Sequence, residues 1–157
     1  MTKNFFVGIG YDSHKIVKKR PLFLGGVKLN ENFGLKGHSD ADVVIHSICD
    51  AILSAIGLPD IGEFFPDSDI NYKNMPSKLI VNKVLNFLQN RKFKISNIDV
   101  VLICDKPKVS IYKQKILESL KKMFNVDFIN IKGKTTEGIS CFKNYIQCYS
   151  VVLLYKK

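Results

Sequence analysis

One aspartate and two histidines of the chain stand at spacings that suit a metal site. Alternate side chains of an extended segment point to the same side, so Asp12 and His14 can face one centre while Ser13 points away. His46 could supply a third ligand from a helix that follows. Asp, His and His with an open fourth position form the donor set of a Zn²⁺ that acts on a substrate. The spacing therefore suggests a catalytic zinc site.

Each of these residues also has a plainer interpretation. An Asp-x-His pair is weak evidence alone, and a histidine between apolar residues, such as His46, is more often hydrogen-bonded in a core than bound to a metal. Clustering favours the ligand interpretation, because His14, His38 and His46 are the only histidines in the chain. We assign Asp42 a structural role, because with Ser39 it forms a capping pattern in which its charge meets the positive end of the helix dipole.

Three other segments combine polar groups that could bind a phosphorylated substrate. DIGEFFPDSD (60–69) holds Asp60, Asp67 and Asp69, which could bind hydroxyl groups, although Asp67 and Asp69 could simply nucleate turns. CDKPKVS (104–110) could offer backbone groups to a base and Lys108 to a phosphate, although an exposed basic turn is the ordinary interpretation. KGKTTEG (132–138) has the hydroxyls, lysines and carboxylate that a phosphate and a hard cation need, but alone it is a polar loop.

The elements that must position these residues alternate between strands and helices. A helix is expected to begin near Ser39 and to continue at 3.6-residue spacing to Gly57. A basic loop, 15–20, is expected after the first strand, and Gly25-Gly26 marks a bulge or a turn in the second. Further patterns predict strands at 5–12, 21–30, 97–105, 128–134 and 146–155 and helices at 77–90 and 109–124. This order indicates one α/β domain, with a sheet that is parallel or mixed.

Composition limits the class of protein. At 157 residues, 46% hydrophobic and 24% charged, the chain is expected to form a single globular domain over 1–157. The net charge of +10 comes almost entirely from lysine, which suits an anionic small molecule better than base recognition, so no nucleic-acid partner is expected. No signal peptide or spanning helix is recognised, so no membrane partner is expected either. The four cysteines, Cys49, Cys104, Cys141 and Cys148, are expected to be buried free thiols in a reducing compartment.

Five motifs, taken together and in order, carry a resemblance to a known family. They are YDSH (11–14), GHSDADVVIH (37–46), DIGEFFPDSD (60–69), DKPK (105–108) and KTTE (134–137). In this pattern the chain resembles the 2-C-methyl-D-erythritol 2,4-cyclodiphosphate synthases of the non-mevalonate isoprenoid pathway. The resemblance implies an α/β (α+β) domain with a mixed sheet covered by helices. It also implies a homotrimer whose active sites lie between neighbouring subunits.

The resemblance implies a reaction and its metals. The reaction is the conversion of 4-diphosphocytidyl-2-C-methyl-D-erythritol 2-phosphate into the cyclic diphosphate with release of CMP, catalysed by a phosphorus-oxygen lyase. Asp12, His14 and His46 match the ligands of one Zn²⁺ per subunit, and Glu137 matches the carboxylate that holds a Mg²⁺ or Mn²⁺ with the substrate diphosphate. Members of this family work in plastids and in the bacterial cytoplasm, so the resemblance implies the plastid stroma if a leader has been trimmed, and the bacterial cytoplasm otherwise.

The resemblance also assigns the remaining site residues. His38 and Thr135 match the positions that stabilise the transition state, and these are the expected catalytic residues. Lys134 stands where the family commonly has threonine, and 138–148 is shorter than the family's usual segment and lacks its arginine and glutamate. The positions that match substrate-binding residues are Asp12, His14, His38, Ser39, Asp60, Ile61, Gly62, Phe65, Pro66, Asp67, Ser68, Asp69, Cys104, Asp105, Lys106, Pro107, Lys108, Val109, Ser110, Lys134, Thr135, Thr136 and Glu137.

Two rival functions predict different behaviour. A metal-dependent phosphohydrolase with the same Asp, His and His ligands would release an acyclic phosphate and would not need the 104–110 loop. A basic nucleic-acid-binding domain would bind its partner in a way that weakens steeply with salt and survives chelation of metal.

Overall fold

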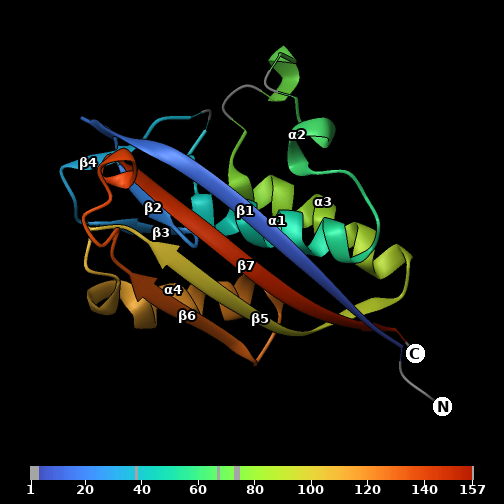
Figure 1. The fold of residues 1–157 in the computed structure, drawn as a ribbon. Helices are drawn as coiled ribbons and strands as arrows, with labels where there is room; N and C mark the ends of the chain where they lie inside the picture. Colours follow the sequence, from blue (N-terminus) through green and yellow to red (C-terminus); the bar gives the residue numbers. More distant parts are fainter. Residues whose placement is uncertain (1–3, 38, 67, 73–74, 157) are drawn as a thin grey trace.

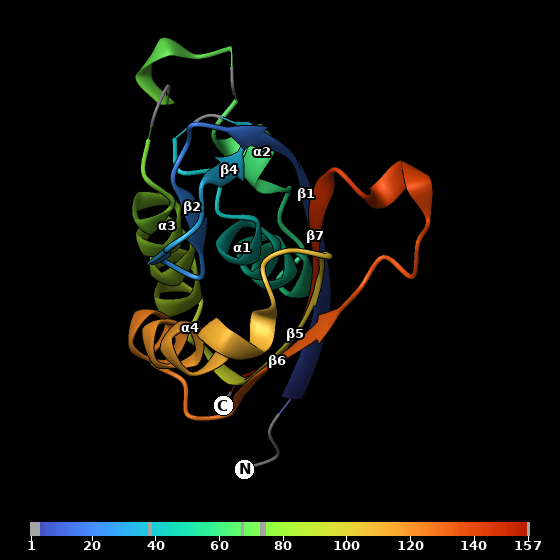
Figure 2. The ribbon, with the colours of Figure 1, turned by 90° about the vertical axis from the view of Figure 1, so that its left-hand side faces the viewer.

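A five-stranded mixed sheet forms one layer of the fold, and helices cover one of its two faces (Figures 1 and 2). The computed structural model describes residues 4–37, 39–66, 68–72 and 75–156. The sheet strands are β1 (Asn4–Lys18), β4 (Phe33–Leu35), β5 (Phe93–Ile103), β6 (Ile129–Lys134) and β7 (Tyr145–Lys156). Their order is β4-β1-β7-β5-β6, and β5 and β6 form the parallel pair among antiparallel neighbours. The implied mixed α+β sheet is therefore confirmed.

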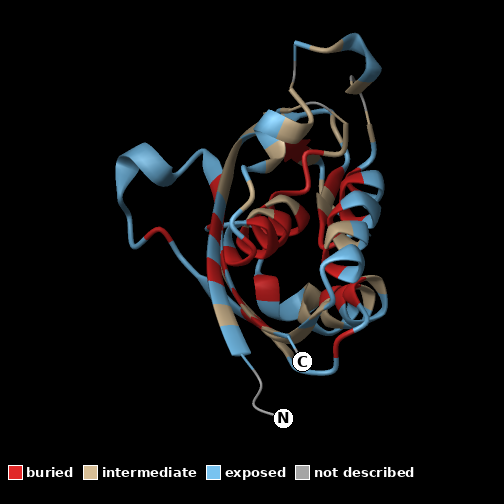
Figure 3. Cartoon of the chain, turned by 90° about the vertical axis from the view of Figure 1, so that its right-hand side faces the viewer, coloured by how far each residue is buried: buried red, intermediate tan, exposed pale blue. Residues whose placement is uncertain are grey.

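The remaining elements surround this sheet. β2 (Leu22–Leu24) and β3 (Val27–Leu29) form a small hairpin, so Gly25-Gly26 is a turn. The helices are α1 (Val43–Ala55), α2 (Ile61–Phe64), α3 (Ser77–Asn90) and α4 (Val109–Phe124), with 3-10 turns η1 (Ile70–Tyr72) and η2 (Ser140–Phe142). The predicted helices at 77–90 and 109–124 are confirmed to the residue. Buried residues gather where the helices face the sheet (Figure 3). Within the described ranges, none of the helices combines the length and apolarity needed to cross a bilayer.

Helix α1 lies directly on strand β1 because two glycines leave room for its backbone. A Cβ atom at Gly8 would lie 2.0 Å from the Ala51 carbonyl oxygen, and one at Gly10 would lie 1.9 Å from that of Ser47. Any side chain at either position would push the helix away from the strand. The close approach brings His46, the neighbour of Ser47, to the strand that carries the other predicted ligands.

Helix α1 begins at Val43, so the prediction of a start near Ser39 is wrong. Ser39 has a φ of 55°, which is a left-handed conformation and not a helical one. Asp42 is the N-cap, and its carboxylate accepts hydrogen bonds from the amides of the second and third helical residues, both at 3.1 Å. It also accepts from the amides of Gly25 and Gly26 at 2.9 and 2.6 Å. The structural role of Asp42 is thus confirmed at a different helix position, and it joins α1 to the β2–β3 turn.

The expected basic loop at 15–20 is also wrong for most of its length. Strand β1 continues to Lys18, because Ile16 to Lys18 pair with Leu35 to Phe33 of β4. This pairing is made by residues well separated in the sequence, and the local run of lysines gave no signal of it. It lengthens β1 beyond the metal-ligand candidates, so that these lie within a paired strand and not at its end.

Candidate metal centre and substrate pockets

Asp12, His14 and His46 meet between β1 and α1. The Asp12 Oδ2 atom lies 3.0 Å from His14 Nε2 and 3.0 Å from His46 Nδ1, and the two ring nitrogens are 3.5 Å apart. A tetrahedral zinc ion with ligand bonds of about 2.0–2.2 Å separates its donor atoms by about 3.3–3.6 Å. The oxygen and two nitrogens match such an ion in type, and their separations lie within about 0.3 Å of its spacing. The structure brings together the three residues that the sequence predicts as ligands.

The charges of this cluster suit metal binding. Burial by itself would raise the pKa of Asp12, but hydrogen bonds and attraction from His14 and His46 hold that pKa well below its ordinary value. Burial would lower the pKa of His46, yet Asp12 outweighs this effect and raises it. The carboxylate is therefore ionised at neutral pH. Because a metal ion needs an unprotonated ring nitrogen, metal binding competes with the proton that this raised pKa favours on His46.

Each histidine presents a different ring nitrogen to the centre. His14 Nδ1 lies 2.9 Å from the carbonyl oxygen of Lys36, which can only accept, so Nδ1 carries the proton and Nε2 is free to bind a metal. His46 Nε2 lies 3.0 Å from Ser77 Oγ, which leaves Nδ1 facing the centre. No sequence pattern had pointed to Ser77.

A cavity of about 520 Å³ opens over the cluster. The predicted site residues that line it are Asp12, His14, Ser39, His46, Ile61, Gly62, Phe65, Pro66 and Ser68. Four further lining residues were not predicted from the sequence, namely Gly37, Tyr72, Met75 and Ile80. Because Tyr72, Met75 and Ile80 are spaced as ordinary apolar residues, nothing in their pattern could have marked them. The cavity joins the ligand atoms to the segment that precedes α3.

Two aspartates of the 60–69 segment accept hydrogen bonds from nearby backbone amides. Asp60 caps α2 by accepting from the Glu63 amide at 3.0 Å, and Asp69 accepts from the backbone and side-chain nitrogens of Asn71, both at 2.9 Å. The turn-forming interpretation is therefore confirmed for Asp69, whereas the capping of α2 by Asp60 was not predicted from the sequence. His38 and Asp67 lie outside the described residues.

A second cavity, of about 500 Å³, lies where β5 and β6 end and α4 begins. The predicted residues that line it are Cys104, Asp105, Pro107, Lys108, Val109, Ser110, Lys134 and Thr135. Lys113, which no sequence motif had indicated, and Lys132 of the 132–138 segment bring the lysines to four, although Lys132 also forms an ion pair with Asp99 at 2.6 Å. The positive end of a helix and four lysines make this a suitable place for a phosphate. No residue lines both this cavity and the one over the metal-ligand cluster.

Two neighbouring loops are joined beside the lysine-rich cavity. The Asp105 carboxylate accepts from the Thr136 amide at 2.9 Å and from the Thr136 hydroxyl at 2.8 Å. These bonds lower the pKa of Asp105. The Thr135 hydroxyl donates to the Glu137 carboxylate. Lys106, Thr136 and Glu137 do not line the cavity. Two of these predicted binding residues, Thr136 and Glu137, instead hydrogen-bond other residues of the two loops.

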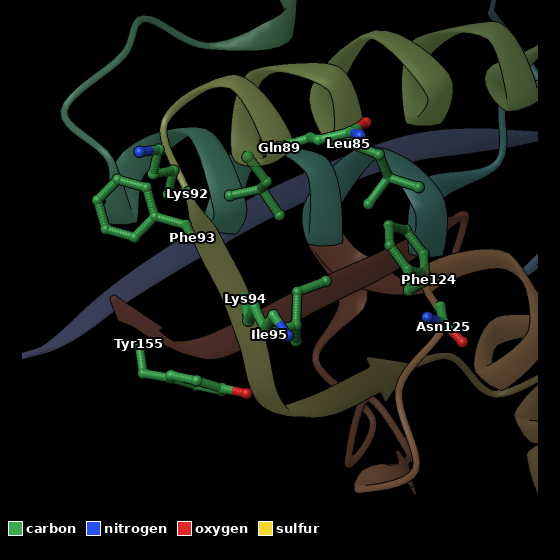
Figure 4. A pocket seen from close by; sticks show the side chains of 10 residues that line it. Leu85, Gln89, Lys92, Phe93, Lys94, Ile95, Phe124, Asn125 and Tyr155 are labelled. Atoms are coloured by element: carbon green, nitrogen blue, oxygen red, sulfur yellow. The ribbon is translucent and has the colours of Figure 1, made fainter. Parts of the chain in front are cut away.

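A larger hollow, of about 700 Å³, lies between α3, α4 and the end of the sheet where β7 finishes (Figure 4). Leu85, Phe93 and Phe124 supply apolar walls, and Lys92 and Lys94 supply charge. None of its lining residues is a carboxylate, a histidine or a cysteine. It therefore offers none of the usual side-chain ligands of a metal ion.

Three of the cysteines behave as predicted and one does not. Cys49, Cys104 and Cys148 are buried, and burial raises the pKa of Cys104 and of Cys148 to about 12. The thiols of Cys104 and Cys148 therefore stay protonated at neutral pH. Cys141 is exposed, so its predicted burial is wrong, because the 135–144 arm that carries it projects away from the sheet (Figure 2).

Comparison with known proteins adds to this geometry. The model of the YgbB family matches residues 5–155. The chain is 45% identical over 152 residues to the 2-C-methyl-D-erythritol 2,4-cyclodiphosphate synthase of Aquifex aeolicus, covering 96% of this chain and 97% of the relative. It is 49% identical over 135 residues to the synthase of Clostridium acetobutylicum, covering 85% and 87%.

Solved structures agree with the sequence comparison. A 2C-methyl-D-erythritol-2,4-cyclodiphosphate synthase in its CDP-bound form is 33% identical with a TM-score of 0.88, covering 94% of this chain and 99% of that one. The Plasmodium falciparum IspF complex with CDP is 35% identical with a TM-score of 0.83, covering 98% and 97%. The bifunctional IspDF of Campylobacter jejuni is 37% identical with a TM-score of 0.91, covering 99% of this chain and 43% of that one.

Proposed function

The chain belongs to the YgbB family, and on that premise we propose that it converts 4-diphosphocytidyl-2-C-methyl-D-erythritol 2-phosphate into 2-C-methyl-D-erythritol 2,4-cyclodiphosphate and releases CMP. This reaction makes it a phosphorus-oxygen lyase. The observation that carries the proposal is the meeting of the Asp12, His14 and His46 donor atoms beside a cavity large enough for the sugar phosphate. The named activity of relatives at 45–49% identity supports it.

The reaction asks the chain mainly to position charged groups. The substrate's own 2-phosphate is the nucleophile, and because its second pKa is about 6 it needs no strong general base. One of its oxygens bonds to the β-phosphorus while the bond from that phosphorus to the CMP oxygen breaks, and CMP leaves. The chain must hold two repelling phosphates in line and neutralise their charge. A Zn²⁺ on Asp12, His14 and His46 would supply a Lewis acid and a template for the phosphate oxygens.

The remaining residues divide between the two cavities. Ser39, Asp60, Gly62 and the stretch 65–69 bind the methylerythritol portion. Of these, Ser39, Gly62, Phe65, Pro66 and Ser68 line the cavity over the metal-ligand cluster. The loop 104–110 receives the cytosine and its phosphate, with help from the lysines and from the positive end of α4. Glu137 would hold a Mg²⁺ or Mn²⁺ with the diphosphate, because an exposed carboxylate suits a hard cation.

Transition-state stabilisation falls to hydrogen-bond donors near the reacting phosphates. The Thr135 hydroxyl stands at the edge of the lysine-rich cavity, where it can exchange its bond to Glu137 for one to a phosphate oxygen. His38 keeps the same role on the resemblance alone.

We propose that the chain assembles as a homotrimer through the face of the sheet that no helix covers. Alternate residues of β1 and β7 make this face apolar, and Val7 and Ile9 are 68% and 64% exposed. Its other large members are Phe5, Tyr11, Tyr149 and Val151. Contiguous apolar surface of this kind marks an interaction site. Beside it, the buried Gln147 Nε2 has no hydrogen-bond partner among the described residues.

Such an assembly would join the two cavities, which stay separate within one chain. The metal-ligand cluster of one subunit would face the 104–110 loop of its neighbour, and one substrate would bridge them. The 135–144 arm, which projects on the uncovered side of the sheet, supports a contact there (Figures 2 and 3). As the compartment we propose the plastid stroma for a chain whose leader has been removed, and the bacterial cytoplasm otherwise.

The proposal is tested by incubating the protein with the cytidyl substrate and following the products by phosphorus NMR. With Zn²⁺ and Mg²⁺ we expect CMP and a cyclic diphosphate in equal amounts, and with a chelator no turnover. An acyclic phosphate product would favour the phosphohydrolase alternative. Absence of turnover with both metals present would contradict the proposed function.

A further inference from the structure

The second ring nitrogen of His46 belongs to a chain of three buried or half-buried polar groups. His46 Nε2 lies 3.0 Å from the Ser77 Oγ atom, and the Ser77 hydroxyl donates to Asp40 Oδ1. The other Asp40 oxygen, Oδ2, accepts from the Ser77 amide at 3.1 Å. Ser77 has no exposed surface at all. The three residues come from α1, from the first position of α3 and from the turn before α1.

The directions of these hydrogen bonds fix the protonation of His46. Because the single hydroxyl proton of Ser77 goes to the Asp40 carboxylate, Ser77 Oγ can only accept from His46. Nε2 must then carry a proton, so the proton that a metal displaces is the one on Nδ1, the atom that faces Asp12 at 3.0 Å. Its loss leaves the tautomer that a metal ligand at Nδ1 requires.

We propose that Asp40 and Ser77 are positioning residues for the metal-binding side chain of His46. They hold its ring in one orientation, keep Nδ1 free and make that nitrogen a stronger donor through the negative charge at the far end of the chain. The inference rests on the metal site proposed above and adds two residues that the family resemblance had not assigned.

Asp40 has a second effect that makes this arrangement rigid. The N-cap of α3 is Pro76, which offers no side-chain hydrogen bond to the helix. Asp40 supplies one from outside, because it binds the Ser77 amide with one oxygen and the Ser77 hydroxyl with the other. The first turn of α3 is therefore attached to the turn that precedes α1. One bond holds the backbone of Ser77 and the other holds the hydroxyl beside His46.

The test compares zinc affinity in three serine variants, measured by competition with a chromophoric chelator. Ser77→Ala removes the acceptor for His46, and we expect zinc to bind about 10- to 100-fold more weakly, as for other groups that orient a metal ligand. Ser77→Thr keeps the hydroxyl and should stay close to the wild type. Ser119→Ala is the matched control, because it removes a hydroxyl that donates to the Gly25 carbonyl oxygen at 2.7 Å on α4. Its zinc affinity should not change.

A spectroscopic measurement separates this role from loss of stability. In the cobalt-substituted protein, the ring N–H protons of His14 and His46 should give two strongly shifted NMR signals that disappear in D₂O. In Ser77→Ala the signal of His46 should broaden through exchange with water, while that of His14 should persist, because Lys36 still accepts it. In Asp40→Asn the same signal should broaden, because an amide nitrogen donates to Ser77 Oγ and the hydroxyl proton, no longer held by a carboxylate, can turn toward the His46 N–H and weaken its bond.

The possible results distinguish the two proposals. Wild-type affinity and two sharp signals in Ser77→Ala would overturn the positioning role and leave the metal site intact. A wild-type protein that binds no zinc would overturn both. Equal losses in Ser77→Ala and Ser119→Ala would show that only stability had changed, and this too would overturn the inference.

Discussion

Replacing Gly10 by alanine should damage the metal centre without touching any ligand. The added Cβ would lie 1.9 Å from the Ser47 carbonyl oxygen, whereas real Cβ atoms essentially never approach closer than 3.0 Å. Relief requires α1 to move from β1 by at least about 1.1 Å at this point, since the obstacle is backbone and not a flexible side chain. His46 precedes Ser47, so it would move away from Asp12 by a similar amount. Metal sites tolerate only about 0.2 Å of such change.

Two measurements follow from this displacement. Overpacking typically costs about 1–3 kcal/mol, and a contact with backbone should place Gly10→Ala at the upper end, measured as the loss in free energy of unfolding in urea. Zinc affinity, measured by chelator competition, should fall by more than about 100-fold, because one ligand is lost outright.

Gly57→Ala is the control for the Gly10 prediction. Gly57 has a φ of 67° and open space around its Cβ position, so alanine there should cost about 1–2 kcal/mol through backbone strain alone. Its zinc affinity should stay at the wild-type value. The reasoning would be refuted if Gly10→Ala bound zinc as tightly as Gly57→Ala does.

Three further predictions concern other parts of the molecule. Asp42→Ala should lower the free energy of unfolding by at least about 2 kcal/mol, because it leaves four backbone amides without their acceptor. His46→Ala should mainly lower the amount of bound zinc, and equal zinc loss in the two variants would contradict this division of roles. Burial raises the pKa of Asp50 to about 6, so the contribution of Asp50 to stability falls as pH rises from about 4 to about 6. The Asp50→Asn variant, whose amide oxygen still accepts from the Ile61 amide, should therefore have a free energy of unfolding in urea about 1 kcal/mol above the wild type at pH 8, after allowance for solvent screening. At pH 3.5 the two proteins should be equally stable. Ile9→Lys should turn a trimer into monomers in sedimentation experiments while zinc binding persists, and a monomeric wild type would contradict the proposed assembly.

Local patterns were enough to find the ligands but not the groups around them. Asp12 and His14 were predictable because alternation along a strand is a local property, and His46 because helical spacing placed it near the start of α1. The start of α1 was misplaced because Asp42 is held by the amides of Gly25 and Gly26, which are distant in sequence.

Contacts between distant segments also explain what the sequence did not reveal. Ser77 lies 31 residues after His46, and only the folded chain places its hydroxyl beside that ring. The continuation of β1 through a run of lysines depends on its pairing with β4 in the same way. Asp69 shows the opposite case, because its local bonds to Asn71 form a turn that was among the alternatives offered by the sequence.

The central claim is that Asp12, His14 and His46 form the metal centre of the active site, and anomalous diffraction at the zinc edge tests it most directly. Crystals of the zinc-loaded protein should show one strong anomalous peak per chain, within about 2.0–2.2 Å of Asp12 Oδ2, His14 Nε2 and His46 Nδ1. A peak elsewhere, or none at this position with zinc present in solution, would contradict the account.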